Sequence, residues 1–166
     1  MLSRRYVLPL FFAVAGLVAG AEGPLGAFEG KWKLDKKKTQ AKGAPEDLEM
    51  EIKADGSNGL VVKSKYREPK SAIYPLMWVG IMTYELPLSS DGSEKTNQIG
   101  PFAHVSKTTV DGKKMTTDWR ATMEKGHVEG QWIRTVSDDG KEMTMQVISK
   151  ASDGRNMDQT LVFARR

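Results

Sequence analysis

Residues 110–136 read VDGKKMTTDWRATMEKGHVEGQWIRTV, and they contain the pattern that decides the fold. Within 115–123, residues typical of a buried face stand at every second position, and polar or charged residues stand between most of them. Side chains of a β-strand point alternately to the two faces of a sheet, so this alternation predicts a strand with one buried face. Asp-Gly at 111–112 and Lys-Gly at 125–126 predict tight turns at its ends, because glycine tolerates positive φ angles.

The same alternation and the same turns recur along most of the chain. Asp-Gly is found four more times, at 55–56, 91–92, 139–140 and 153–154. The pattern predicts about nine short strands, at 28–35, 47–55, 58–67, 77–87, 102–110, 113–123, 126–136, 141–150 and 157–165. Helical periodicity is lacking, apart from a weak indication of one helical turn within 36–46.

A meander of this kind leaves two exposed sheet edges unless it closes on itself. We therefore expect an all-β fold, a single antiparallel up-and-down barrel of about eight to ten strands. A two-sheet β-sandwich is the alternative that the pattern leaves open.

The N-terminus has the features of a secretory signal peptide. Arg4 and Arg5 precede an apolar stretch at 6–18, and Ala-Gly-Ala at 19–21 is typical of a cleavage site. The apolar stretch is shorter than the ~18 residues that a membrane-spanning helix needs. We expect a signal peptide at 1–21, a barrel domain at 22–166 and a periplasmic or extracellular protein. An ordinary secretion signal and a twin-arginine signal both remain open.

Charge and cysteine content narrow the possible functions. The chain has 25 basic and 21 acidic residues, interspersed, and no cysteine. Disulfides, thiolate metal sites and cysteine nucleophiles are therefore excluded. Five lysines cluster at 31–38 without arginine or aromatic neighbours suited to nucleic acid, so we expect no nucleic-acid partner.

The first predicted strand begins Phe28-Glu29-Gly30-Lys31-Trp32, and its Gly-x-Trp resembles the signature of lipocalins and fatty-acid-binding proteins. The order of strands is also similar to that of small exported bacterial lipocalin-like proteins of unassigned function. The resemblance implies that Trp32 closes one end of the barrel beside Gly30. It also implies an arginine across the ring, for which Arg165 or Arg166 is favoured over Arg134. The helix pair of fatty-acid-binding proteins and the further lipocalin motifs are not evident.

The apolar faces supply the candidate ligand-binding residues. Methionine adapts to irregular apolar surfaces, and the predicted inner faces are rich in it. The candidates are Met50, Ile52, Val62, Tyr66, Met115, Trp119, Met123, Trp132, Met143 and Met145. A packed core explains the same residues equally well.

The segment 73–82 is the most apolar one after the signal. As a loop, it would expose Tyr74, Leu76, Met77 and Trp78 as a portal, a partner site or a peripheral membrane contact. A loop folded back into the mouth of the barrel is the alternative.

Catalysis receives little support from the sequence. His127 and Glu129 share a strand face, and His104 is the other histidine, so a metal site would lack ligands. We expect Asp118, Arg120, Glu129 and Arg134 to form cross-strand ion pairs opposite the apolar faces.

The sequence thus favours an exported protein that binds a small apolar ligand, such as a lipid or fatty acid, with no cofactor, metal or enzymatic activity. The alternative is a solid barrel that serves as a structural or interaction module of the cell envelope. The sequence leaves the oligomeric state open.

Overall fold

A computed structural model describes residues 25–41, 44–67, 81–99 and 102–166, with residues 81 and 82 described by their backbone alone. Ten strands are found in these ranges. They are β1 (Gly30–Leu34), β2 (Asp47–Asp55), β3 (Gly59–Arg67), β4 (Ile81–Ser89), β5 (Asp91–Ile99), β6 (Phe102–Asp111), β7 (Lys114–Met123), β8 (Gly126–Val136), β9 (Glu142–Ala151) and β10 (Asn156–Arg165). The described part of the chain contains no helix of the length and apolarity needed to cross a membrane.

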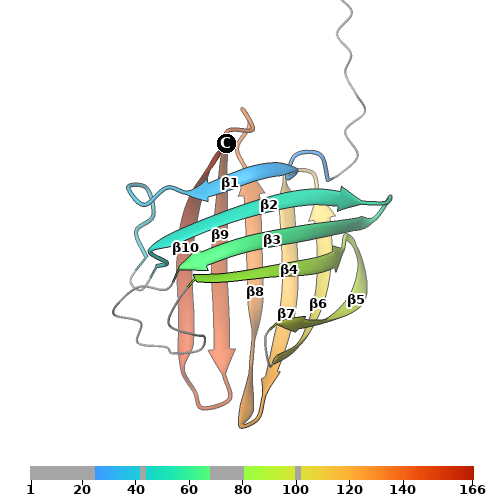
Figure 1. Cartoon of the computed structure of the whole chain (residues 1–166), viewed down its shortest axis with the longest axis vertical. Helices are drawn as coiled ribbons and strands as arrows, with labels where there is room; N and C mark the ends of the chain where they lie inside the picture. The colour runs from blue at the N-terminus through green and yellow to red at the C-terminus, as the bar shows by residue number, and fades with distance from the viewer. Residues whose placement is uncertain (1–24, 42–43, 68–80, 100–101) are drawn as a thin grey trace, which may run out of the picture.

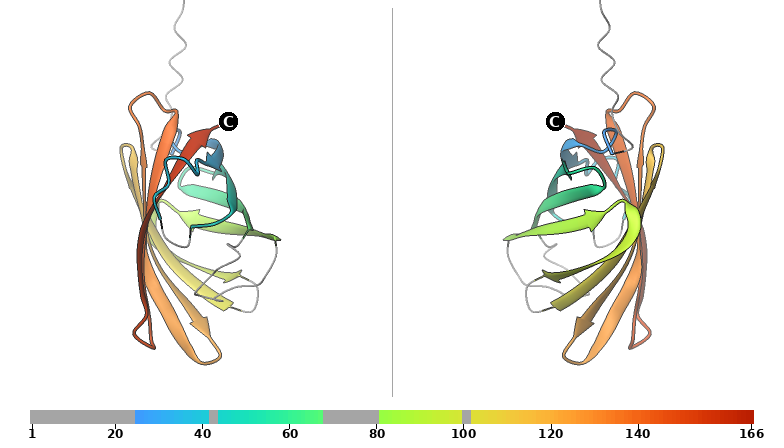
Figure 2. Two further views of the ribbon diagram at one scale, coloured as in Figure 1. Left: turned by 90° about the vertical axis from the view of Figure 1, so that its left-hand side faces the viewer. Right: turned by 90° about the vertical axis from the view of Figure 1, so that its right-hand side faces the viewer.

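The strands form one antiparallel sheet that curls into a nearly closed barrel. Its order is β4-β3-β2-β1-β10-β9-β8-β7-β6-β5, so the first strand pairs with the last. Strands β1 to β4 cross in front of β6 to β10, which run along the long axis (Figure 1). The side views show these two groups facing each other as two layers (Figure 2). The expected up-and-down barrel is confirmed, because the pairing of β1 with β10 joins both layers into one continuous sheet.

Strands β4 and β5 are the two edges of the sheet. They are connected through Ser90, and the side-chain Nδ2 of Asn97 on β5 donates to the carbonyl of Pro87 on β4 at 3.0 Å. Pro87 has no backbone N–H to contribute to a ladder, so an edge position suits it.

The sequence-based count of strands was one too low, because β5 was missed. Its sequence DGSEKTNQI has no alternation of apolar and polar residues, and most of its side chains are exposed. Pairing with β6 and the turn at Ser90 hold it in place instead. Residues 36–38 form a turn, and no helix is found among the described residues of 36–46.

One end of the barrel is filled by a packed core. Phe28 and Phe163 are 0% exposed and Trp32 is 1% exposed. Met115 and Met143 are also fully buried there. The Trp32 indole Nε1 donates to the carbonyl of Phe28 at 2.8 Å, which satisfies the one polar atom of the indole. We call these five residues the packed end.

Candidate functional site

Beyond the packed end, the register of β6, β7 and β8 places a series of polar and aromatic residues along the barrel interior. Arg134 lies directly opposite Met115, and the next inward pair is Trp132 with Thr117. Trp119 then lies opposite both Ser106 and Gly130, and His104 comes one pair further on, opposite Ala121. The inner surface thus changes from apolar to polar and aromatic within a few residues. We call His104, Ser106, Trp119, Trp132 and Arg134 the interior polar cluster.

Arg134 is the most unusual member of this cluster. Its side chain is buried, and its Nε and Nη1 have no hydrogen-bond partner among the described residues. Burial lowers the pKa of Arg134 to about 10, an effect that the neighbouring Tyr84 partly offsets. The guanidinium is therefore charged at neutral pH. None of the described aspartates and glutamates is buried, so no carboxylate in this part of the chain neutralises it.

An unpaired buried charge is costly, by several kcal/mol even after relaxation of the surroundings. Trp132 provides partial compensation, because the guanidinium carbon lies 5.4 Å from the centre of its ring. A ring face cannot replace hydrogen bonds to two N–H groups. The arrangement therefore suits an anionic group that enters the barrel and accepts hydrogen bonds from Arg134.

Trp132, the ring beside Arg134, belongs to a group of three aromatic rings with His104 and Trp119. The ring centre of His104 lies 6.0 Å from that of Trp119 and 5.6 Å from that of Trp132. The ring centres of Trp119 and Trp132 are 5.1 Å apart. The three ring planes are inclined to one another by only 17°, 13° and 28° in the same order. The rings thus form a compact triangle of nearly parallel planes, contributed by three adjacent strands.

His104 is 2% exposed, and neither ring nitrogen has a hydrogen-bond partner among the described residues. Burial lowers the pKa of His104 to about 4, so the imidazole is neutral at pH 7. A neutral imidazole offers one N–H donor and one nitrogen acceptor. The Nε1 of Trp119 and the Oγ of Ser106 are likewise buried without a partner in the described part of the chain.

The cluster adjoins residues whose polar groups are better satisfied. Thr108 and Thr117 face each other across β6 and β7, with their hydroxyl oxygens 3.0 Å apart. On β10, the side-chain oxygen of Gln159 has no partner among the described residues. The unpaired atoms of His104, Ser106 and Trp119 lie on the far side of the threonine pair from the packed end, and those of Arg134 lie on the near side.

The apolar candidates from the sequence all point inward, but they separate into two groups. Met50, Ile52, Val62, Met115, Met143 and Met145 are buried in the core cluster. Met115 and Met143 have 0% exposure, which leaves them no surface for a ligand. The second group keeps part of its surface accessible although it faces inward, and it consists of Tyr66, Trp119, Met123 and Trp132. These four side chains are half-buried.

Trp32 and Arg165 form the pair that the family resemblance implied at the closed end of the barrel. The Arg165 guanidinium carbon lies 4.3 Å from the centre of the Trp32 ring, and the two residues are register partners. Gly30 has a φ of +121°, and a Cβ there would lie 3.3 Å from Arg165 Nη1. Of the arginines considered, Arg165 is therefore the one that packs across the tryptophan.

Two sequence-based expectations were wrong or incomplete. Arg134 was expected on the outer face in a cross-strand ion pair, whereas it points inward, in phase with Trp132 and Val136. His104 was considered only as a metal ligand beside His127 and Glu129. It faces the interior, whereas those two lie on the outer face of β8, so the three cannot share an ion. The described residues contain no group of three potential metal ligands.

The segment 73–80, with Tyr74, Leu76, Met77 and Trp78, lies outside the described residues. So do the side chains of residues 81 and 82 and the expected signal peptide at 1–21.

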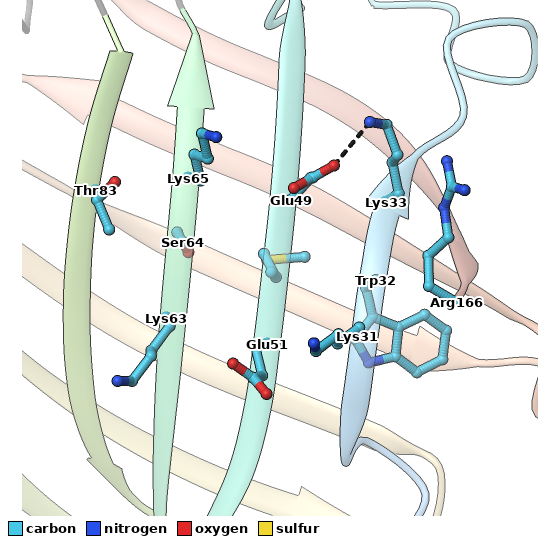
Figure 3. A pocket seen from close by; sticks show the side chains of 11 residues that line it. Lys31, Trp32, Lys33, Glu49, Glu51, Lys63, Ser64, Lys65, Thr83 and Arg166 are labelled. Atoms are coloured by element: carbon cyan, nitrogen blue, oxygen red, sulfur yellow. Dashed lines mark hydrogen bonds and ion pairs between the residues drawn. The ribbon is translucent and has the colours of Figure 1, made fainter.

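A groove of about 420 Å³ is a second candidate, on the outer face of β1 to β4. Lysines and glutamates dominate its lining, and Arg166 stands at its rim (Figure 3). Two of its lysines form exposed ion pairs, since Lys33 contacts Glu49 at 2.7 Å and Lys63 contacts Glu85, a neighbour of the lining, at 2.7 Å. Exposed pairs of this kind need no ligand. The interior, where polar groups lack partners, is therefore the better candidate site.

No protein-family model matches this sequence, and no curated protein does so either. Solved structures, in contrast, share the fold. Fatty-acid-binding protein 1 of Echinococcus granulosus aligns with a TM-score of 0.50 and 12% identity over 84% of this chain and 97% of that one. The fatty-acid-binding protein of Schistosoma mansoni, solved with arachidonic acid, aligns with a TM-score of 0.50 and 14% identity over 87% of this chain and 99% of that one. A secretory abundant heat soluble protein of Ramazzottius varieornatus aligns with a TM-score of 0.53 and 12% identity over 84% of this chain and 96% of that one.

These similarities extend over nearly the whole of each compared chain, at identities that establish the fold alone. The protein shares the fold of these structures, an antiparallel up-and-down β-barrel, which is the architecture that the Gly-x-Trp strand implied.

Proposed function

We propose that the protein is an exported binding protein that takes a small, largely apolar acid, such as a fatty acid or a lipid with an acidic group, into its barrel. The observation that carries this proposal is Arg134, a charged and buried side chain with two unpaired nitrogens on the inner face, as far as the described residues extend. Apolar surface of the ligand would pack against Tyr66, Met123, Trp119 and Trp132, which face inward and keep accessible area.

The fold supports the same function. One barrel of similar architecture was solved with arachidonic acid, an apolar chain with a carboxylate. The N-terminal pattern of Arg4, Arg5, an apolar stretch and Ala-Gly-Ala supports export to the periplasm or beyond. Sequencing of the secreted protein's N-terminus tests this part, and a start near Glu22 is expected.

Binding is tested with a fluorescent fatty acid and with its methyl ester, which has the same chain but no charge. We expect saturable binding, with the acid bound more tightly than the ester. Arg134→Met should reduce the acid-to-ester affinity ratio about tenfold or more, because a hydrogen bond to a charged group contributes about 1.5–3 kcal/mol. The matched control is Arg120→Met, which changes an exposed arginine on the outer face of β7.

Lack of saturable binding by either probe would leave the solid structural barrel as the function to pursue. Binding of acid and ester with equal affinity would keep a carrier but remove Arg134 from its site. Solvent extraction of the purified protein, followed by mass spectrometry, would identify any molecule that it carries from the cell.

A further inference from the structure

We infer that the triangle of His104, Trp119 and Trp132 is a subsite for a flat aromatic group that carries a hydroxyl. This inference rests on the proposed function and narrows it. The ligand would be a hydroxylated aromatic acid, with its acidic group at Arg134 and its ring system against the triangle, rather than a saturated chain.

The first argument is the shape of the triangle. The three rings stack on one another on the inner face of β6, β7 and β8, with nearly parallel planes and ring centres 5.1–6.0 Å apart. Trp119 and Trp132 retain accessible surface there. Aromatic rings gain energy beyond simple burial when they meet in an offset parallel arrangement. A flat conjugated ligand can extend this stacking, whereas a flexible alkyl chain gains only from burial.

The second argument is the set of atoms around the rings that have no partner within the described ranges. Trp119 Nε1 can only donate, neutral His104 can donate at one nitrogen and accept at the other, and Ser106 can do both. An alkyl chain would leave all of these atoms unpaired, at a cost for each one. A carboxylate accepts only, so it would leave the accepting nitrogen of His104 unsatisfied.

A hydroxyl group matches these requirements. Its oxygen can accept from the indole N–H of Trp119, and its hydrogen can be donated to the unprotonated nitrogen of His104. Ser106 lies directly opposite Trp119 on the neighbouring strand, so it can contribute a further hydrogen bond to the same oxygen. A phenolic hydroxyl places such a group in the plane of an aromatic ring.

The position of Arg134 completes the recognition. Its guanidinium carbon is 5.4 Å from the Trp132 ring centre, and Trp132 belongs to the triangle. An aromatic acid can therefore stack along Trp132 while its carboxylate reaches Arg134. The hydroxyl, at the opposite end of the ring system, would point toward His104, which lies furthest from the packed end in the register.

The test uses three acids with the same number of carbon atoms: undecanoate, naphthoate and hydroxynaphthoate, the last with the hydroxyl opposite the carboxylate. Affinities are measured by isothermal titration calorimetry with the mature protein. We expect naphthoate to bind more tightly than undecanoate. Hydroxynaphthoate should bind about tenfold more tightly than naphthoate, the amount that hydrogen bonds to the buried nitrogens contribute.

Two variants locate the effect. Trp119→Phe keeps an aromatic ring but removes the N–H, and His104→Phe keeps a flat ring but removes both nitrogens. Each should bring the hydroxynaphthoate-to-naphthoate affinity ratio close to one. The control is His127→Phe, the same substitution at the histidine on the outer face of β8, which should leave the ratio unchanged.

Nuclear magnetic resonance of the wild-type imidazole nitrogens provides a measurement independent of any variant's folding. Hydroxynaphthoate should shift the nitrogen resonances of His104 and leave those of His127 in place. Saturable binding of undecanoate at least as tight as that of the aromatic acids would overturn the aromatic subsite and leave the proposed binding function intact. Absence of saturable binding by all three acids would overturn both.

Discussion

Among the described residues, two tryptophan–arginine pairs are found, and their arginines differ in how their hydrogen-bond donors are satisfied. Arg165 lies 4.3 Å from the Trp32 ring centre, and its three nitrogens donate to the carbonyls of Gly140, Glu29 and Ala27 at 2.6 Å each. Arg134 lies 5.4 Å from the Trp132 ring centre, and two of its nitrogens have no partner in the described part of the chain. The protein itself satisfies the donors of Arg165, whereas its described residues do not satisfy those of Arg134.

This difference separates a residue that closes the fold from a residue that is available to a ligand. The same guanidinium group serves both purposes, so residue type alone does not distinguish them. The number of hydrogen bonds left unmade does, because a buried donor without a partner lowers stability and serves no purpose in folding. Substitutions at each pair, compared with one another, test this distinction.

The largest effect is expected at the packed end, from Trp32→Ala. The substitution removes a fully buried indole, its hydrogen bond to Phe28 and the ring beneath Arg165. We expect a loss of about 3–5 kcal/mol in the free energy of unfolding, measured by urea titration. Trp132→Ala, at a partly exposed position, should cost distinctly less. Equal losses would mean that Trp132 is packed as tightly as Trp32.

The next largest effect is a dependence of stability on pH that originates at His104 of the interior polar cluster. His104 has a pKa of about 4 in the folded protein and 6.5 in the unfolded chain. Between these values the unfolded chain binds more protons, so stability is complete above pH 6.5 and falls as the pH drops toward 4. The loss should be about 3 kcal/mol in total.

Unfolding titrations between pH 5 and 6.5 isolate this contribution. The exposed carboxylates with lowered pKa values, such as Glu49 and Asp91, act only below their ordinary values of 4.5 and 3.8. His104→Phe should flatten the curve in that interval, and His127→Phe should not. A wild-type protein whose stability is constant from pH 6.5 to 5 would show that His104 is solvated rather than buried.

Substitutions of Arg165 and of Arg134 should change the free energy of unfolding in opposite directions. Arg165→Met leaves the carbonyls of Ala27, Glu29 and Gly140 without their donor, so we expect a loss of about 2 kcal/mol. Arg134→Met removes an unpaired buried charge and keeps the volume, so we expect a gain of about 2 kcal/mol together with weaker binding of acids. Thermal and urea unfolding of the two variants, side by side, measure this contrast. Destabilisation of both would place a partner for Arg134 within the protein.

The barrel was predictable from sequence because most strands bury one face and expose the other. Strand β9 shows this well, with Met143, Met145 and Val147 inward. Strand β5 was not predictable, since its side chains are polar on both faces and its place depends on pairing with β6. Long-range pairing leaves no periodic signal in the sequence.

The candidate site was predictable only in its apolar part. Trp119 and Trp132 stand out as inward residues of alternating strands. On β6 the inward residues are His104, Ser106 and Thr108, whereas Val105 faces outward, so hydrophobicity assigns the faces wrongly. Arg134 did carry a signal, because it continues the inward phase of Trp132 and Val136 on the same strand. The assumption that an arginine must be exposed concealed it.

The smallest expected effect lies at the threonine pair, next to Trp132 of the interior polar cluster. Thr108 and Thr117 are 1% and 0% exposed, and their hydroxyls bond only to each other among the described residues. Thr117→Val keeps the shape but leaves the Thr108 hydroxyl buried and unpaired, which should cost about 1 kcal/mol. The double variant Thr108→Val/Thr117→Val should recover most of that loss, because no unpaired group remains.

The double-mutant cycle therefore decides which region the threonine pair belongs to. Recovery in the double variant, measured by urea unfolding, would mean that the pair is a self-contained part of the core. A double variant as unstable as the sum of the single ones would show that each hydroxyl has a further partner in the barrel interior. In that case the threonine pair would belong to the same region as the unpaired groups of Arg134 and His104.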